Sequence, residues 1–423
     1  MGILLAIALI ILALSILIVI HELGHFWAAR MFGIRVESFA LFFGKKLWGI
    51  KRGDTEWRIN AVPLGGYVKI SGMLDEHMDE EQMNAEPQPW EFRSKPIWQR
   101  LIVMLGGIIM NVILGIVIFI FYMFFVGERK IPFENVQHGL YVHENTIAHD
   151  LGFRTGDKIK NYMGEKAIWF SDYTDPNNLV DRGKYFIVDR NGTEKRIDIP
   201  NDFINDFQES GERTLFSPDM PPIIFVRDTG DYKDWHKIEP EKKAKVVMQG
   251  FLGGMRDRDK IISIDSIAMP LYSQAAEYVK DKPNQTIDIQ VERAGKLIDL
   301  KVTSNDSGLI GFGPYEDTLK VQVDYSFGES IPRGVSMAFS SVTNTVKGLV
   351  AVFTGNADPS KSLSGPIQIA GFYERIYAAD GWAGFWRLTG LLSMVLAVMN
   401  LLPIPVLDGG QVVILLIEGI IGR

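Results

Sequence analysis

The chain of 423 residues contains no cysteine, which excludes disulfide bonds and metal sites built from thiolates. It has no excess of positive charge either: the formal net charge is −7, which gives no reason to expect nucleic-acid binding. Charged side chains are absent from whole stretches, among them residues 1–20 and 101–125. Because about 20 apolar residues span the hydrocarbon of a bilayer, the sequence predicts a membrane protein.

The first apolar run is not typical of a cleaved signal peptide. It lacks a basic start, and no small-x-small cleavage site stands directly before His21. The run continues to Ala29, and Arg30 is the first basic residue. We therefore expect a retained first transmembrane helix over residues 1–30. Similar runs predict a second helix over 97–126 and a third over 381–411, and we expect residues 412–423 to begin a fourth, truncated helix.

The motif His21-Glu22-Leu23-Gly24-His25 ends the first apolar run. Residues four apart lie on one face of a helix, so the two imidazoles are predicted to point the same way, with the Glu22 carboxylate beside them. Two histidines at this spacing suit Zn²⁺, and the glutamate can take a proton from water at the metal. The alternative is a membrane helix that ends in a polar cluster without chemistry, but ionisable groups in such a run are costly and usually functional.

A zinc peptidase needs a third protein ligand, and no third histidine follows at metzincin spacing, where Ala28 replaces the motif's glycine. Asp408 is the candidate. It is a lone carboxylate between apolar runs, after a segment broken by Pro403 and Pro405, and irregular backbone at membrane depth is tolerated where it lines a cavity. The alternative is that Asp408 caps the helix that follows it.

The polar loop over residues 31–96 is rich in lysine and arginine, which predicts a cytoplasmic location. Two stretches alternate as strands do, Glu56–Asn60 and Gly66–Ile70, and we expect a hairpin-like element with its turn at Pro63–Gly66. The edge formed by Gly66, Tyr67, Val68, Lys69 and Ile70 is a candidate site for an extended peptide, although a sheet that serves packing alone is the alternative.

Residues 127–325 contain an internal repeat. Gly152–Ile159 matches Gly254–Ile261 at an offset of 102 residues, and Val188–Gly192 matches Val291–Gly295 at an offset of 103. We therefore expect two copies of one β-rich domain, over 127–222 and 223–325. The segment Gly308–Phe312 fits either a loop that holds a chain terminus by its backbone N–H groups or a glycine-rich strand end without a ligand. Residues 326–380 are expected to form an amphipathic helix and a linker.

These segments together resemble the site-2 intramembrane metalloproteases, and specifically the bacterial regulator of sigma-E protease branch. The resemblance covers nearly the whole chain. It rests on the His-Glu motif in the first membrane segment, Gly106-Gly107 with Asn111 in the second, the tandem domains, which resemble PDZ domains, and two later motifs: Ser364-Gly365-Pro366-Ile367 and Asn400-x-x-Pro403-x-Pro405-x-x-Asp408-Gly409.

The resemblance implies a polytopic α-helical membrane protein with an intramembrane metalloprotease core and two inserted, β-rich PDZ-like domains. It also implies a multi-pass protein of the bacterial inner membrane, with the PDZ-like pair in the periplasm. Its partners would be the lipid bilayer and transmembrane substrates: an anti-sigma factor that another protease has already cut, and remnant signal peptides. We expect His21, His25 and Asp408 to hold Zn²⁺ and Glu22 to act as the base, while Asn400, Pro403, Pro405 and Gly66–Ile70 bind substrate.

Two other functions compete with this one. A non-proteolytic PDZ membrane scaffold would carry a structural metal, but structural zinc usually has four protein ligands and only three are evident here. A metal-ion transporter would be expected to show more polar membrane helices and repeated transmembrane units, which the sequence does not show. Both features favour the protease.

Overall fold

The computed structural model divides the chain into two compact units, residues 1–128 with 324–423 and residues 129–323. The structure describes the following ranges: 2–73, 86–144, 146–170, 173, 184–200, 207, 214–226, 249–354, 365–405 and 407–421.

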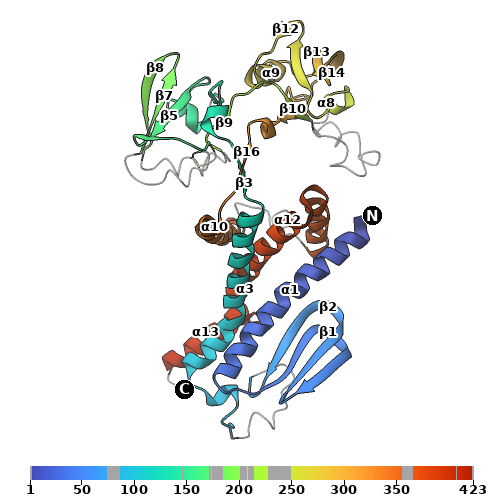
Figure 1. The fold of residues 1–423 in the computed structure, drawn as a ribbon, viewed down its shortest axis with the longest axis vertical. Helices are drawn as coiled ribbons and strands as arrows, with labels where there is room; N and C mark the ends of the chain where they lie inside the picture. Colours follow the sequence, from blue (N-terminus) through green and yellow to red (C-terminus); the bar gives the residue numbers. More distant parts are fainter. Residues whose placement is uncertain are drawn as a thin grey trace. The chain divides into compact units, whose positions relative to one another are not determined.

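The first unit is built around long apolar helices (Figure 1). They are α1 (Gly2–Met31), α3 (Ile97–Phe125), α10 (Phe327–Phe353), α12 (Pro366–Leu401) and α13 (Asp408–Ile421). Among the described residues, three helices are long and apolar enough to cross a membrane: Leu4–Met31, Ile97–Phe125 and Gln368–Leu401. The α12 helix is interrupted at Gly381, which has φ 58° and ψ −140°. The α10 helix begins after Ser326, which forms a capping box with Glu329.

Glycines let α1 and α3 approach closely. A β-carbon on Gly106 would lie 2.8 Å from the carbonyl carbon of Gly24 and 3.2 Å from the amide nitrogen of His25. Small residues at such a crossing allow the backbones of two membrane helices to touch. The crossing therefore places the His-Glu motif of α1 directly against the first half of α3.

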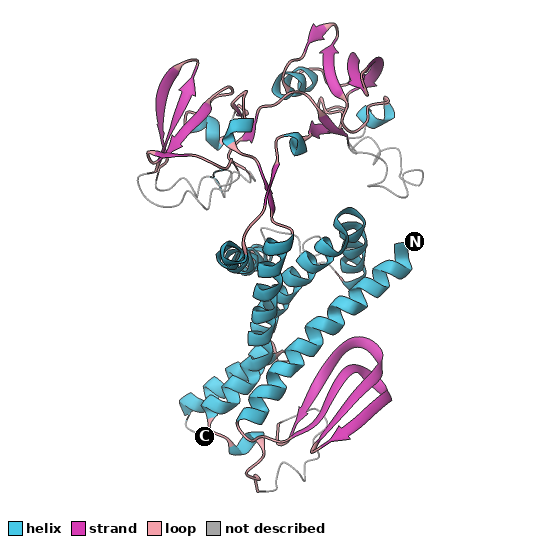
Figure 2. Ribbon diagram, viewed as in Figure 1, coloured by secondary structure: helices cyan, strands magenta, loops and turns pink. Residues whose placement is uncertain are grey.

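The sheet of the first unit consists of β1 (Val36–Arg52) and β2 (Thr55–Ile70), two long bent strands (Figure 2). Phe39 pairs with both Trp57 and Val68, so residues 38–41 lie between the two halves of β2. The predicted hairpin turn at Pro63–Gly66 is therefore wrong. The two halves of β2 do not pair with each other, because a continuous apolar stretch of β1 inserts between them. The hairpin turn lies instead at Gly53, which has φ 62°.

The half of β2 that covers Gly66–Ile70 forms an edge of this sheet. It pairs with β1 on one side, through Gly66 with Leu41 and Ile70 with Val36. No strand in the described ranges pairs with its other side. The edge of β2 is thus open to an added strand.

The second unit contains two four-stranded sheets with the same strand order, β6-β5-β7-β8 and β12-β11-β13-β14. The first sheet consists of β5 (Lys158–Tyr162), β6 (Glu165–Lys166), β7 (Tyr185–Arg190) and β8 (Thr193–Asp198). The second consists of β11 (Lys260–Ile264), β12 (Ile267–Ala268), β13 (Thr286–Arg293) and β14 (Lys296–Thr303). Shorter elements complete the fold: β3 (Glu128–Lys130), β4 (Leu140–Tyr141), α4 (Ile147–Asp150), β9 (Ser217–Pro218), β10 (Ile224–Val226), α8 (Gln249–Leu252), α9 (Tyr272–Lys280), β15 (Phe312–Pro314) and β16 (Val321–Val323).

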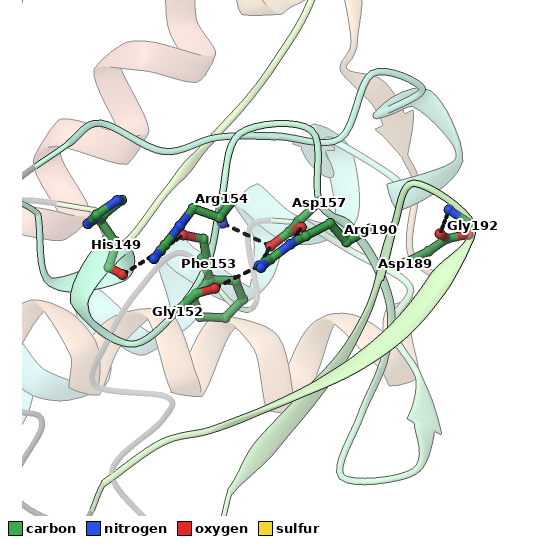
Figure 3. A network of polar contacts seen from close by, with 8 residues as sticks. All are labelled: His149, Gly152, Phe153, Arg154, Asp157, Asp189, Arg190 and Gly192. Carbon is green, nitrogen blue, oxygen red and sulfur yellow. Dashed lines mark hydrogen bonds and ion pairs between the residues drawn. The ribbon is translucent and has the colours of Figure 1, made fainter.

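An identical polar network anchors each sheet. In the first, the buried Asp157 carboxylate accepts hydrogen bonds from the Arg154 backbone and from two nitrogens of Arg190, whose Nη2 also donates to the Gly152 carbonyl (Figure 3). In the second sheet the same contacts join Asp259, Arg256, Arg293 and Gly254. The sequence repeat therefore corresponds to a repeated structure. Each buried carboxylate is fully paired, which a buried charge requires.

Candidate metal centre

The helical spacing of α1 brings the two imidazoles of the motif together. Nε2 of His21 lies 3.3 Å from Nε2 of His25, and the rings meet edge to face with their centroids 4.9 Å apart. His25 is buried and His21 is half-buried. One turn of helix is therefore sufficient to point both rings at a common position.

Asp408 completes the cluster from the far end of the sequence. It is the first residue of α13, and its Oδ2 lies 3.1 Å from Nε2 of His21 and 3.5 Å from Nε2 of His25. Within the described ranges, these three side chains form the one group whose ligand atoms lie within 4.8 Å of one another. The structure thus brings together the three residues predicted from the sequence as metal ligands.

Hydrogen bonds to the other ring nitrogens decide which atoms face this position. Nδ1 of His25 lies 2.8 Å from the carbonyl oxygen of Val103 on α3. A carbonyl only accepts, so Nδ1 carries the proton and the lone pair is on Nε2. Nδ1 of His21 lies 3.2 Å from Nδ2 of Asn111, whose Oδ1 is buried and finds no donor in the described part of the chain.

A half-turn of the Asn111 amide places Oδ1 against Nδ1–H of His21 and satisfies both groups. Both Nε2 lone pairs then face Oδ2 of Asp408, a buried atom for which the described residues offer no hydrogen-bond donor. Three electron-rich atoms at such distances repel one another unless a cation lies between them. Two imidazole nitrogens and one carboxylate oxygen are a typical donor set for a catalytic Zn²⁺ site with an open fourth position. The residues therefore fit a zinc ion.

Gly107 on α3 leaves room for the cluster. A β-carbon at this position would collide with both imidazoles, reaching 2.5 Å from Cε1 and 2.7 Å from Nε2 of His21. Alanine is the smallest residue that carries a β-carbon, so only glycine fits here without displacing the rings. The sequence identified Gly106-Gly107 as part of a motif, and the structure shows the steric reason for its second glycine.

Glu22 faces a cavity of about 220 Å³ that also contains the two histidines and Asp408. The carboxylate of Glu22 accepts a hydrogen bond from the backbone amide of Val68. A β-carbon on Gly66 would lie 3.6 Å from Cγ of Glu22. The edge of β2 is therefore in contact with the acidic residue of the motif, and a general base is available beside the candidate metal position.

Most of the predicted substrate-binding residues line this cavity. All five residues of the β2 edge do so, from Gly66 to Ile70. Asn400 approaches from α12, with Nδ2 3.5 Å from Nε2 of His21. Pro403 and Pro405 are not among the residues that line the cavity; they are exposed, in the irregular segment between α12 and α13.

The sequence prediction missed three residues of the site. The carbonyl of Val103 orients His25, and Met73 and Met104 line the cavity. Every residue type has a backbone carbonyl, so the sequence does not show which one contacts His25. A methionine in an apolar segment is most often a core residue. Only the packing of α3 against α1 shows their positions.

A membrane helix carrying two histidines and a glutamate, joined by a distant carboxylate, defines a class of protein: the membrane-embedded metallopeptidases. The comparison with protein families agrees. The chain belongs to peptidase family M50, whose model matches residues 9–423. It is therefore a zinc metalloprotease of the site-2 protease family and a membrane protein.

Curated relatives match over nearly the whole chain. The regulator of sigma-E protease RseP of Escherichia coli K12 is 29% identical over 437 residues, which cover 97% of this chain and 90% of that protein. The regulator of sigma E protease of Haemophilus influenzae is 28% identical, with 98% and 90% covered. A Vibrio cholerae protein whose name describes it as a zinc metalloprotease is also 28% identical, with 98% and 90% covered.

Proposed function

We propose that this protein is an intramembrane zinc endopeptidase that cleaves the transmembrane segments of single-pass proteins. His21, His25 and Asp408 would hold the zinc ion, and Glu22 would act as general base. One observation carries this proposal: two imidazole lone pairs on α1, a helix long and apolar enough to cross a bilayer, converge with an unsatisfied carboxylate oxygen of Asp408.

The zinc ion, when bound, supplies a Lewis acid that lowers the pKa of a water molecule toward about 7. The chain's own residues handle the proton. Glu22 lies in the same cavity as the ligands, accepts the proton of the attacking water and later donates it to the leaving amine. The backbone N–H of Val68, beside the Glu22 carboxylate, would help to orient it for this transfer.

A helical substrate hides its peptide carbonyls in its own hydrogen bonds, so it must unwind before cleavage. The open edge of β2, Gly66–Ile70, would hold the unwound segment by strand pairing. This edge lines the same cavity as Glu22, which supports the proposal. Asn400, beside His21, would hydrogen-bond the extended backbone.

The names of the relatives and the basic loop suggest the biological setting. We infer that the substrates are an anti-sigma factor already cut by another protease, and remnant signal peptides. The basic residues of 31–96 favour a cytoplasmic loop. The two β domains, proposed to be PDZ-like, would then lie in the periplasm of a bacterial inner membrane and exclude substrates with bulky external domains.

The variant Glu22→Gln tests the assignment of the base. It removes the carboxylate but keeps the shape of the side chain, so zinc should still bind while cleavage of a membrane-embedded reporter falls by at least about 100-fold. Zinc content and cleavage are both measured on the purified full chain, and a zinc chelator should abolish cleavage by the unaltered protein. Undiminished cleavage by Glu22→Gln would refute the assignment.

A further inference from the structure

A bidentate ion pair joins the start of α3 to the end of α13. Nη1 of Arg100 donates to Oε2 of Glu418 at 3.0 Å, and Nη2 donates to Oε1 of the same carboxylate. The two residues are 318 positions apart in the sequence. The Arg100 side chain is 12% exposed and that of Glu418 is 28% exposed, so the pair is largely shielded from water.

The surroundings of the pair hold it in place. The Arg100 guanidinium lies 5.9 Å from the centre of the Phe92 ring. One turn before Glu418, Leu415 is buried in an apolar cluster that includes Val103 and Met104 of α3. These contacts make α13 run alongside the first half of α3, as Figure 1 also shows.

Asp408 and Glu418 lie on the same short helix, about 15 Å apart at a rise of about 1.5 Å per residue. On α3, Arg100 and Gly107 are separated by about 10 Å. At one end of α13, Asp408 contacts the two histidines of α1, whose rings lie against Gly107 of α3. At the other end, Glu418 contacts Arg100 of α3 directly. A slip of α13 by one turn would move Asp408 by about 5.4 Å, beyond the reach of either imidazole.

The segment that connects α12 to α13 is not a continuous helix, so packing contacts must set the position of α13 along its axis. Residues 402–405 and 407 are not helical, and Gly410 packs against the backbone of Ile404 and Pro405. The planar fork of arginine fixes both distance and direction when it binds a carboxylate with two hydrogen bonds, which a lysine cannot do. The ion pair supplies a directional contact at the opposite end of α13 from Asp408.

We propose that the Arg100–Glu418 pair is a positioning clamp that sets the axial position of α13 and thereby holds Asp408 against His21 and His25. The inference rests on the proposed role of Asp408 as a zinc ligand. It assigns neither residue a part in the chemistry, since neither lines the cavity of the candidate site.

Zinc affinity is the first measurement, by competition with a chromophoric chelator on the full chain in detergent. Glu418→Gln should lower the affinity at least tenfold, and Arg100→Lys, which keeps the charge without the fork, should lower it less. The exchange Arg100→Glu with Glu418→Arg should restore most of it. The matched control is Asp380→Asn, which removes the exposed ion pair with Arg387 on α12 and should leave the zinc affinity unchanged.

Helix position is the second measurement, and the absence of native cysteine makes it direct. Spin labels are attached at Ile109→Cys on α3 and Ile420→Cys on α13, both exposed positions. Pulsed electron resonance without metal should give one narrow distance distribution, and adding Glu418→Gln should broaden or shift it. If the unaltered protein bound no zinc, the proposed function would fail, yet these distances would still decide whether the pair positions α13.

The clamp is refuted if Glu418→Gln leaves the zinc affinity within twofold of the unaltered protein. It is also refuted if the affinity falls while the label distances stay unchanged, because the effect would then not pass through α13. Restored affinity together with a restored distance distribution in the charge exchange is the result we expect.

Discussion

His21 and His25 present the same ring nitrogen to the candidate metal position because α3 fixes the other nitrogen of each. Val103 does so with a backbone carbonyl and Asn111 with a side-chain amide. The hydroxyl of Ser393 on α12 donates to the backbone carbonyl of Asn111 at 2.7 Å. This contact helps to position Asn111 beside His21. Partners behind the ligands commonly set both the tautomer and the orientation of a metal-binding histidine.

Asn111 offers a direct test of this arrangement. Asn111→Leu removes the acceptor for Nδ1–H of His21, so we expect the zinc affinity to fall about 10–100-fold. Asn111→Asp keeps an acceptor at the same place and should lose much less. Chelator competition measures both variants. Equal affinities for the leucine variant and the unaltered protein would show that Asn111 serves packing alone.

Gly107 tests the steric part of the site. Gly107→Ala places a β-carbon against both imidazoles, so zinc affinity should fall roughly tenfold or more. The matched control is Gly348→Ala on α10, where a β-carbon meets nothing within 4 Å and zinc affinity should be unaffected. Metal content after dialysis against a weak chelator separates the two variants. Full zinc occupancy in Gly107→Ala would mean that the rings can move aside at no cost.

Sequence alone could identify the candidate ligands because metal-binding chemistry depends on residue type and local spacing. His21 and His25 follow from a helical period, and Asp408 from the cost of a lone carboxylate in an apolar segment. The contact between these three side chains depends on tertiary packing, which local spacing does not determine. The sequence motif contained Asn111, yet its contact with His21 could not be predicted, because it depends on how α3 rotates against α1.

The β2 strand shows where local pattern fails. The alternation of its two halves correctly predicts two strands, but it does not determine which strand each half pairs with. That depends on a third segment, residues 38–41 of β1, which pairs with both halves. The consequence for the site is favourable to the proposed function. With β1 between the halves, Gly66–Ile70 becomes an edge beside Glu22.

Val68→Pro tests that edge. Proline removes the backbone N–H that donates to the Glu22 carboxylate. Because this N–H lies on the open side of the edge strand, the pairing with β1 stays intact. Cleavage of a membrane-embedded reporter should fall at least about tenfold while zinc content stays the same. Val68→Ala keeps the N–H and should cleave nearly as well as the unaltered protein. Normal cleavage by the proline variant would exclude any part for this amide.

The molecule as a whole combines a candidate metal site, built from residues 21, 25 and 408, with a pair of β domains inserted in the sequence between its helices. The repeat was predictable because Asp157 and Asp259 lie in the same short motif, and each must meet an arginine about 33 residues later. The contact between the two copies was not predictable. Asp219, just after β9, does not belong to the repeated motif. Its buried carboxylate accepts hydrogen bonds from the backbone amide and hydroxyl of Ser273 on α9.

Burial raises the pKa of Asp219 above its ordinary value of 3.8, and the hydrogen bonds from Ser273 and Met220 only partly oppose this effect. A raised folded-state pKa means that the stabilising contribution is complete below the unfolded pKa and is lost as the pH rises through the folded value. At pH 7 the ionised carboxylate therefore costs stability. Asp219→Asn keeps an acceptor without the charge and should raise the melting temperature of the full chain at pH 7.

The pH dependence of that difference distinguishes this effect from a change in packing. As the pH falls toward about 4, Asp219 takes up its proton in the unaltered protein, so the two melting temperatures should converge. Comparing the variant with the unaltered protein at each pH cancels the titration of all other groups. Asp288→Asn, which removes an exposed ion pair with Lys301 in the second four-stranded sheet, serves as the control. A difference that stays constant from pH 7 to pH 4 would show that burial of the Asp219 charge does not destabilise the junction between the β domains.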